Sequence, residues 1–209
     1  MKYQHPDAVL MIFCKAPIPN QVKTRLIPAL SPELACQLHR QLSLNAIRLT
    51  TDSPLCPVQL WCSPSIDHDF FYMAANTYPV TLWQQHGNDL GKRMHAAFCS
   101  ALKTYSHALL IGCDCPSLTH GDLAEALNTL KLGSDIVLGP AEDGGYVLVG
   151  LNQTQAQVFA DIDWGTSNVL KQTRMKIQSL GLNLHELATQ WDVDTPEDLA
   201  RYNALNKCY

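Results

Sequence analysis

The chain has 209 residues, 46% of them hydrophobic and 16% charged, and its 15 Lys and Arg against 19 Asp and Glu give a formal net charge of −4. Folding at this length removes about 70% of the unfolded chain's surface from water, so neither disulfides nor a structural metal is needed for stability. The apolar content excludes a disordered chain, and the mild acidity argues against a nucleic-acid partner. We predict a single domain over residues 1–209.

Eight cysteines are spread along the chain, several of them inside apolar runs, which is typical of reduced, buried thiols. Cys113 and Cys115 form a tight pair, but one intervening residue and no second pair is poor spacing for zinc. The longest apolar run, Ala8 to Cys14, is too short to cross a bilayer or to act as a secretory signal. These features predict a soluble, cytoplasmic protein without a membrane partner. The cysteines stand at positions 14, 36, 56, 62, 99, 113, 115 and 208.

Short β-rich runs alternate with stretches of helical period, which predicts an α/β fold with a mainly parallel sheet and helices on both faces. The wholly apolar first run is typical of a central parallel strand. Ser31 with Pro32, and Thr195 with Asp198, have the composition of helix starts. Strands are predicted at Ala8 to Cys14, Val58 to Cys62, Val80 to Trp83, Ala108 to Gly112, Ile136 to Leu138 and Tyr146 to Leu151. Helices are predicted from Ser31, Leu90, Thr119, Val169 and Thr195.

The loop after the first strand concentrates positive charge, because Lys15, Lys23 and Arg25 fall within eleven residues. Arg offers a planar fork to phosphate oxygens, Lys offers a mobile point charge, and the two prolines of the loop lower the entropy lost on ordering it. This loop therefore favours a polyphosphate ligand, with a solvated basic turn as the alternative. It is not a P-loop, and the chain has no Gly-x-Gly-x-x-Gly fingerprint.

Two aspartates stand where an open α/β sheet binds ligands, at the carboxyl ends of its strands. Asp114 follows the strand that ends at Gly112, and Asp194 comes directly before the Thr195 helix start. Such carboxylates can hold Mg²⁺ or Mn²⁺ against phosphate oxygens. Capping of the following turn or helix is the alternative for each of them.

A third loop joins two acids to two glycines and an aromatic ring. Glu142 and Asp143 precede Gly144, Gly145 and Tyr146. The glycines allow a backbone to approach a ligand closely, and the ring can stack on or hydrogen-bond a sugar or base. We therefore expect a substrate-binding loop rather than a bare hairpin turn.

Five motifs in order span nearly the whole chain and carry a family resemblance. They read Lys-Ala-Pro-x-Pro-x-x-x-Lys-Thr-Arg-Leu, Gly-x-Asp-Leu-Gly-x-Arg-Met, Gly-x-Asp-Cys-Pro-x-Leu, Gly-Pro-x-x-Asp-Gly-Gly-Tyr and Asp-Thr-Pro-Glu-Asp-Leu. The set resembles the DUF2064 family of the nucleotide-diphospho-sugar transferase superfamily, which implies the glycosyltransferase A fold. Asn20 replaces the usual Gly of the first motif, and Asn tolerates the left-handed backbone that a turn requires there.

The resemblance implies roles for the charged residues of these motifs. Lys15, Lys23 and Arg25 would face nucleotide phosphates, while Asp114 and Asp194 would hold the divalent metal. The remaining candidates are Asp89 and Arg93 for nucleotide or acceptor contacts, Glu142 or Asp143 as general base near the acceptor, and Trp164 in the acceptor pocket. An ordinary helix start is the alternative for Asp89 and Arg93, and a core side chain for Trp164.

Three functions follow from this pattern. The family's usual label favours a glycosyltransferase that moves a sugar from a nucleotide-diphosphate donor to a small-molecule acceptor, with Mg²⁺ or Mn²⁺. The alternative is a nucleotidyltransferase that joins a nucleoside triphosphate to a phosphorylated acceptor and releases pyrophosphate, because the last motif also resembles those enzymes. A non-catalytic nucleotide-binding domain is the third possibility.

Overall fold

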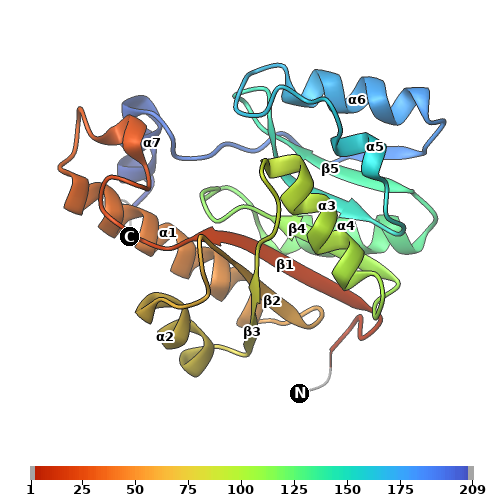
Figure 1. The fold of residues 1–209 in the computed structure, drawn as a ribbon, viewed down its shortest axis with the longest axis horizontal. Coiled ribbons are helices and arrows are strands. Elements are labelled where there is room, and N and C mark those ends of the chain that lie inside the picture. The colour runs from red at the N-terminus through yellow and green to blue at the C-terminus, as the bar shows by residue number, and fades with distance from the viewer. Residues whose placement is uncertain (1–2, 207–209) are drawn as a thin grey trace.

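One mixed sheet organises the domain, and its strand order is β3-β2-β1-β4-β6-β5-β7 (Figure 1). The computed structural model describes residues 3–206, so Cys208 and the two ends of the predicted domain lie outside the described residues. The pairs β1 with β2, β1 with β4, β2 with β3 and β5 with β7 are parallel, while β6 runs antiparallel to both its neighbours. The strands are β1 Ala8–Lys15, β2 Val58–Ser63, β3 Val80–Gln84, β4 His107–Ile111, β5 Ile136–Pro140, β6 Tyr146–Leu151 and β7 Leu184–Glu186.

Side chains of β1 alternate between two hydrophobic clusters, one on each face of the sheet. Leu10 and Ile12 join the cluster under α1, α2 and α4, whereas Val9 and Met11 join the cluster under α3, α5 and α6. Both faces are therefore covered, which explains why this strand is apolar throughout. The helices are α1 Pro32–Thr51, α2 Asp69–Thr77, α3 Leu90–Ala101, α4 His120–Lys131, α5 Ala156–Phe159, α6 Val169–Ser179 and α7 Pro196–Asn206, with a 3-10 turn at Thr24–Leu26.

The predicted helix starts are confirmed by their hydrogen bonds. The Ser31 hydroxyl accepts from the Leu34 N–H at the start of α1. Thr119 begins α4 with a reciprocal capping box. At the start of α7, the Thr195 N–H donates to the Asp198 carboxylate at 2.8 Å. Each of these bonds pairs a backbone N–H group at a helix start that has no partner within the helix. Because both partners are near in sequence, the sequence alone is enough to locate the helix starts.

The reversed direction of β6 places one loop at the crevice. Because β5 and β6 form an antiparallel pair, the connection at residues 141–145 turns at the same edge as the carboxyl ends of β1 and β4. The C-terminal helix α7 lies beside α1 (Figure 1), where Tyr202 packs in one cluster with Leu42 and Trp191. This docking brings the segment before α7 over the same edge.

Seven cysteines lie within residues 3–206, and all of them are free thiols, as the sequence predicted for reduced side chains. Among the helices that these residues form, none combines the length and apolar character needed to cross a membrane.

Candidate active site

Backbone contacts hold three loops together at the carboxyl edge of the sheet. The Val193 N–H donates to the Asp114 carbonyl at 3.1 Å, which ties the segment before α7 to the loop after β4. The Glu142 N–H donates to the Gln190 carbonyl at 3.0 Å and ties the same segment to the β5–β6 hairpin. Carboxylates far apart in sequence therefore meet along one crevice.

Lys23 stands between the two predicted metal ligands. Its Nζ is 3.0 Å from Asp114 Oδ2 and 3.0 Å from Asp194 Oδ1, and only 2% of its side chain is exposed. Burial opposes its charge, but the two carboxylates outweigh burial and raise the pKa of Lys23. The Lys23 ammonium, which we expected to face phosphate, is therefore already paired with two carboxylates. It lies buried at the bottom of the crevice.

The loop reaches this position through two residues with left-handed backbone, Asn20 at φ 64° and Lys23 at φ 48°. Asn20 thus adopts the left-handed conformation that the sequence analysis expects at this turn. Arg25 follows on the 3-10 turn, and its Nη1 is 3.3 Å from Asp194 Oδ2 while 65% of its side chain remains exposed. Arg25 and the exposed Lys15 are therefore the cations of this loop that remain open to a ligand.

His39 of α1 lies beneath Asp114 and was not among the predicted site residues. Its Nδ1 is 3.6 Å from Asp114 Oδ1, and its Nε2 donates to the Lys15 carbonyl at 2.9 Å. Burial opposes its charge, but nearby Cys113, Asp114 and the carbonyl outweigh it and raise the pKa of His39 to about 9. For Asp114, burial favours protonation, yet Lys23 and His39 hold the pKa of its carboxyl well below the usual value.

A first pocket, here called the basic pocket, opens above β1 and β4. Its volume is about 390 Å³. Arg93 reaches it from α3, held by hydrogen bonds from Nε to the Gly87 carbonyl at 3.0 Å and from Nη1 to the Ser63 hydroxyl at 3.4 Å. The charged side chains that line it are Lys15, Lys23, Arg25, His39, Arg93, Asp114 and Asp194.

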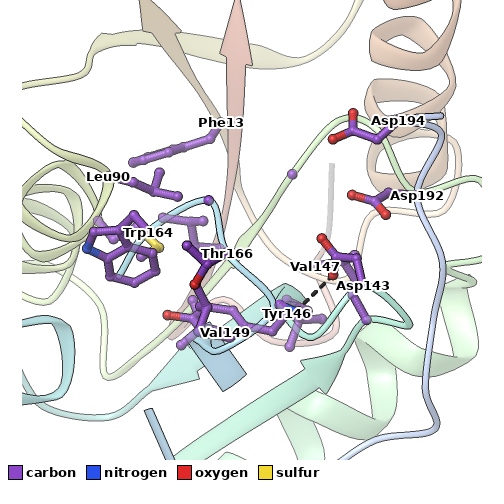
Figure 2. Close-up of a pocket in the computed structure, with 18 of the residues that line it drawn as sticks. Phe13, Leu90, Asp143, Tyr146, Val147, Val149, Trp164, Thr166, Asp192 and Asp194 are labelled. Carbon is purple, nitrogen blue, oxygen red and sulfur yellow. Dashed lines mark hydrogen bonds between the residues drawn. The ribbon is translucent and has the colours of Figure 1, made fainter. Parts of the chain in front are cut away.

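A second pocket of about 260 Å³, here called the acidic pocket, adjoins the first. The two share Arg25 and Asp194 together with three uncharged lining residues. Figure 2 shows Asp143, Asp192 and Asp194 along one wall, opposite the apolar side chains of Phe13, Leu90 and Trp164.

The β5–β6 hairpin supplies the floor of the acidic pocket. Gly144 has φ 87°, and its backbone packs so closely on Ser167 that a Cβ atom would collide with that residue. Asp143 Oδ1 accepts from the Gly145 N–H at 2.8 Å, which fixes its carboxylate toward the pocket. Tyr146 meets Trp164 edge to face, with ring centroids 6.3 Å apart.

Two predicted site residues point elsewhere. Glu142 is exposed and pairs with Arg201 of α7 at 2.9 Å, and it does not line the acidic pocket. Asp89 caps α3 by accepting from the Lys92 N–H at 2.8 Å and lines neither the basic nor the acidic pocket. The structure thus places Asp89 in the ordinary helix-start position that the sequence left as its alternative.

Asp192 is the carboxylate that sequence reasoning missed. The fully buried Val193 separates it from Asp194, and the extended backbone turns both aspartates toward the crevice. Burial, and after it Asp143 and Asp194, raise the pKa of Asp192 to about 6. The alternation of Asp192, Val193 and Asp194 was the available signal. The aspartates of the similar strings at 67–69 and 161–163 are exposed.

The carboxylates of Asp114 and Asp194 have the chemistry of a hard-cation site. Each oxygen lies 3.0 Å from the same ammonium, so the two oxygens are at most 6.0 Å apart. Lys23 acts as a stand-in cation between them, which shows that the position favours positive charge. Oxygen donors of this kind suit Mg²⁺ or Mn²⁺.

Comparisons with known proteins place this site in a family. The family described as "Uncharacterized protein conserved in bacteria (DUF2064)" matches residues 46–166. A candidate nucleotide-diphospho-sugar transferase from Desulfovibrio desulfuricans G20 is 30% identical, with a TM-score of 0.88, and the match covers 97% of this chain and 88% of that one. No curated protein gave a significant match.

Two more distant structures share the fold alone. The 4-diphosphocytidyl-2C-methyl-D-erythritol synthase of Anaerococcus prevotii DSM 20548 is 8% identical, with a TM-score of 0.61 over 97% of this chain and 96% of that one. A Mycobacterium tuberculosis H37Rv protein solved in complex with manganese is 16% identical, with a TM-score of 0.54 over 92% and 96%. The chain therefore belongs to the DUF2064 family and has the nucleotide-diphospho-sugar transferase fold.

Proposed function

We propose that the protein is a glycosyltransferase, which takes a sugar from a nucleotide-diphosphate donor in the basic pocket and passes it to an uncharged acceptor in the acidic pocket. The acid lining of the second pocket is the observation that supports this choice. Three aspartates line it against one arginine, and that arginine already pairs with Asp194. Such a wall repels a phosphorylated acceptor and suits a hydroxyl group that must lose a proton.

The basic pocket supplies the charge that a departing diphosphate needs. Lys15 at the end of β1, Arg25 on the 3-10 turn and Arg93 on α3 all line the pocket. Their positive charge stabilises the nucleoside diphosphate as its bond to the sugar breaks. Asp114 and Asp194 would hold a divalent cation here, and a bound Mg²⁺ or Mn²⁺ supplies further neutralisation of the diphosphate.

Asp143 is the proposed general base. Its carboxylate faces the acidic pocket, and the Gly145 N–H holds one oxygen and leaves the other for a substrate. The acceptor hydroxyl gives its proton to Asp143 as its oxygen attacks the anomeric carbon, and the nucleoside diphosphate leaves from the opposite side. We do not assign this role to Glu142, the other predicted base, because it lies outside the pocket lining and pairs with Arg201.

The opposite wall fits the body of the acceptor. Trp164 and Tyr146 form an edge-to-face pair there, and Leu90 and Phe13 continue the apolar surface toward the basic pocket. Aromatic faces stack on the C–H faces of sugars and on other flat or apolar ligands. The acceptor is therefore expected to be a small molecule with an apolar face and a free hydroxyl group.

Nucleotidyl transfer is the second candidate, because the exposed Lys15 and Arg25 line the pocket where a triphosphate would be neutralised and because a cytidylyl synthase shares the fold. A thermal-shift panel of nucleotide sugars and nucleoside triphosphates, with and without Mg²⁺ or Mn²⁺, identifies the donor. A turnover assay with that donor then separates the reactions. Sugar transfer releases a nucleoside diphosphate, whereas pyrophosphate released from a triphosphate would overturn the proposal.

A further inference from the structure

Three potential metal ligands converge below the floor of the basic pocket. Cys14 lies near the end of β1, Cys113 follows the end of the neighbouring parallel strand β4, and His39 descends from α1. One ligand atom from each of these side chains lies within 4.8 Å of the others. All three side chains are buried, with 1% of Cys14, 3% of His39 and 6% of Cys113 exposed.

Asp114 lies beside this group. Its Oδ1 lies 3.5 Å from Cys113 Sγ and 3.6 Å from His39 Nδ1, while its Oδ2 faces Lys23 on the other side. The carboxylate therefore has one oxygen in the cluster and one in the crevice. Three donor side chains thus converge, and an oxygen of a fourth, Asp114, lies beside two of them.

The imidazole is already oriented as a ligand would be. Nε2 of His39 donates to the Lys15 carbonyl at 2.9 Å, which leaves Nδ1 on the side of Asp114. Metal-binding histidines usually donate their second ring nitrogen to a carbonyl or carboxylate, which fixes the ring and its tautomer. Cys14, His39 and Cys113 also line the basic pocket, so an ion has a path from solvent to the cluster.

We infer that Cys14, His39 and Cys113, with Asp114 Oδ1 as the fourth ligand, form a zinc site beneath the basic pocket, which shares only Asp114 with the carboxylate pair proposed to face the nucleotide. Two thiolates, one imidazole and one carboxylate are a normal tetrahedral zinc set. Soft sulfur donors do not suit Mg²⁺, so the two sites select different ions. Zinc replaces the protons of both thiols and any proton on His39 Nδ1, and those protons pass to solvent.

The site also explains why two strand ends carry thiols beside a catalytic crevice. Zinc would link β1, β4 and α1 at the point where both substrate pockets begin. It would hold Asp114 through Oδ1 and leave Oδ2 for Lys23. The spacing of Cys113 and Cys115 gave no hint of this, because the partners are non-local and Cys115 instead contacts Ser117 at 3.4 Å.

The test uses the purified, reduced full chain and needs no substrate. Zn²⁺ is titrated in competition with a chromophoric chelator, and Co²⁺ is added separately as a spectroscopic substitute. We expect one Zn²⁺ per chain and, with Co²⁺, a thiolate charge-transfer band together with the intense visible bands of a tetrahedral site. Cys14→Ser, Cys113→Ser and His39→Gln should each weaken Zn²⁺ binding at least tenfold and diminish those bands.

Two control variants separate this site from its surroundings. Cys36→Ser removes a thiol outside the cluster, and Asp194→Asn removes the crevice carboxylate that does not face it. Both should keep the stoichiometry and the Co²⁺ spectrum of the wild type. Circular dichroism of the metal-free variants confirms that they fold.

The Co²⁺ spectrum of the unmodified protein is informative even where a variant does not fold. Absence of a thiolate band from the wild-type chain would overturn the proposal. So would zinc binding that survives in Cys14→Ser and Cys113→Ser, since the metal would then lie elsewhere. None of these outcomes depends on whether the protein transfers sugar or a nucleotide.

Discussion

The basic and acidic pockets adjoin, yet they are built differently. Cations of the basic pocket stand on the loop after β1 and on α3, and Lys15 and Arg25 remain exposed. Acids of the acidic pocket stand on a tight hairpin and on an extended segment that hydrogen bonds hold in place. The difference suggests separate tasks, since exposed cations can follow a flexible polyphosphate while a fixed carboxylate can take a proton from one position.

Lys23 lines the basic pocket at its boundary with the acidic pocket, because its partner Asp194 lines both. It has the charge of the basic side, but its ammonium is committed to Asp114 and Asp194. Its positive charge keeps these two neighbouring carboxylates ionised when no metal is bound. Ionised carboxylates are the form that binds a divalent cation. The comparison of the two pockets can therefore be tested by removing single charged groups: Asp143 from the acidic pocket, Lys23 near the boundary, and Arg25, which lines both pockets.

The largest effect is expected from Asp143→Asn. Amide in place of carboxylate keeps the size of the side chain but removes the base, so kcat for sugar transfer should fall by about 10²–10⁴-fold. Glu142→Gln is the matched control, because its carboxylate pairs with Arg201 outside the pocket, and a change of only a few-fold is expected. Steady-state rates with the donor found by thermal shift measure both. Equal losses would show that the hairpin acts through its fold rather than through one base.

Lys23→Met should destabilise the protein by about 1–3 kcal/mol. Removing one partner from a fully buried ion pair costs about 3–5 kcal/mol, but roughly a third of each aspartate side chain is exposed, so water compensates part of the loss. Mg²⁺ should then raise the melting temperature of the variant more than that of the wild type, because the carboxylates no longer have a cation. Lys92→Met, which removes an exposed pair with Asp89, should stay within about 0.5 kcal/mol. If Mg²⁺ raised the melting temperature of the variant and of the wild type equally, Lys23 would not occupy the position of a bound cation.

The strands were predictable because their signals are local. The six predicted strands are present within a residue or two of the expected bounds, since apolar runs and caps depend on neighbours in sequence. Helix α2 was missed because Phe70, Phe71 and Tyr72 are consecutive and show no helical period. Strand β7 was missed because three half-buried residues at a sheet edge leave almost no pattern.

The members of the site were predictable in part, but their contacts were not. The motifs located Lys23, Asp114 and Asp194, yet the burial of Lys23 depends on Asp194, 171 residues away in sequence. His39 carried no signal, because one histidine on the inner face of a helix resembles any core side chain. Tertiary packing decided which charged groups face a pocket, and single-sequence patterns do not contain that information.

Gly91→Ala tests how the apolar wall is positioned. A Cβ at Gly91 would lie 2.5 Å from the Phe159 carbonyl oxygen and 2.8 Å from Trp164 Nε1, so Trp164 must shift. We expect a loss of about 1–2 kcal/mol in stability and a higher KM for the acceptor. Gly121→Ala is matched, because it is also the second residue of its helix and its Cβ would meet only Thr119 Oγ1 at 3.4 Å. That control should be neutral or slightly stabilising. If the KM for the acceptor were unchanged in Gly91→Ala, Trp164 would not contact the acceptor.

The smallest effect on stability is expected from Arg25→Ala, although Arg25 lines both pockets. Its pair with Asp194 is 3.3 Å long and largely exposed, and such pairs contribute about 0–1 kcal/mol. If the cations of the basic pocket bind the donor's phosphates, the variant should have a melting temperature close to that of the wild type. Its KM for the donor should be higher and should depend less on salt concentration, because one phosphate contact is lost. A fall in melting temperature as large as that of Lys23→Met would contradict this expectation. Arg25 would then belong to the buried charge network with Lys23, and it would not be a cation available to the donor.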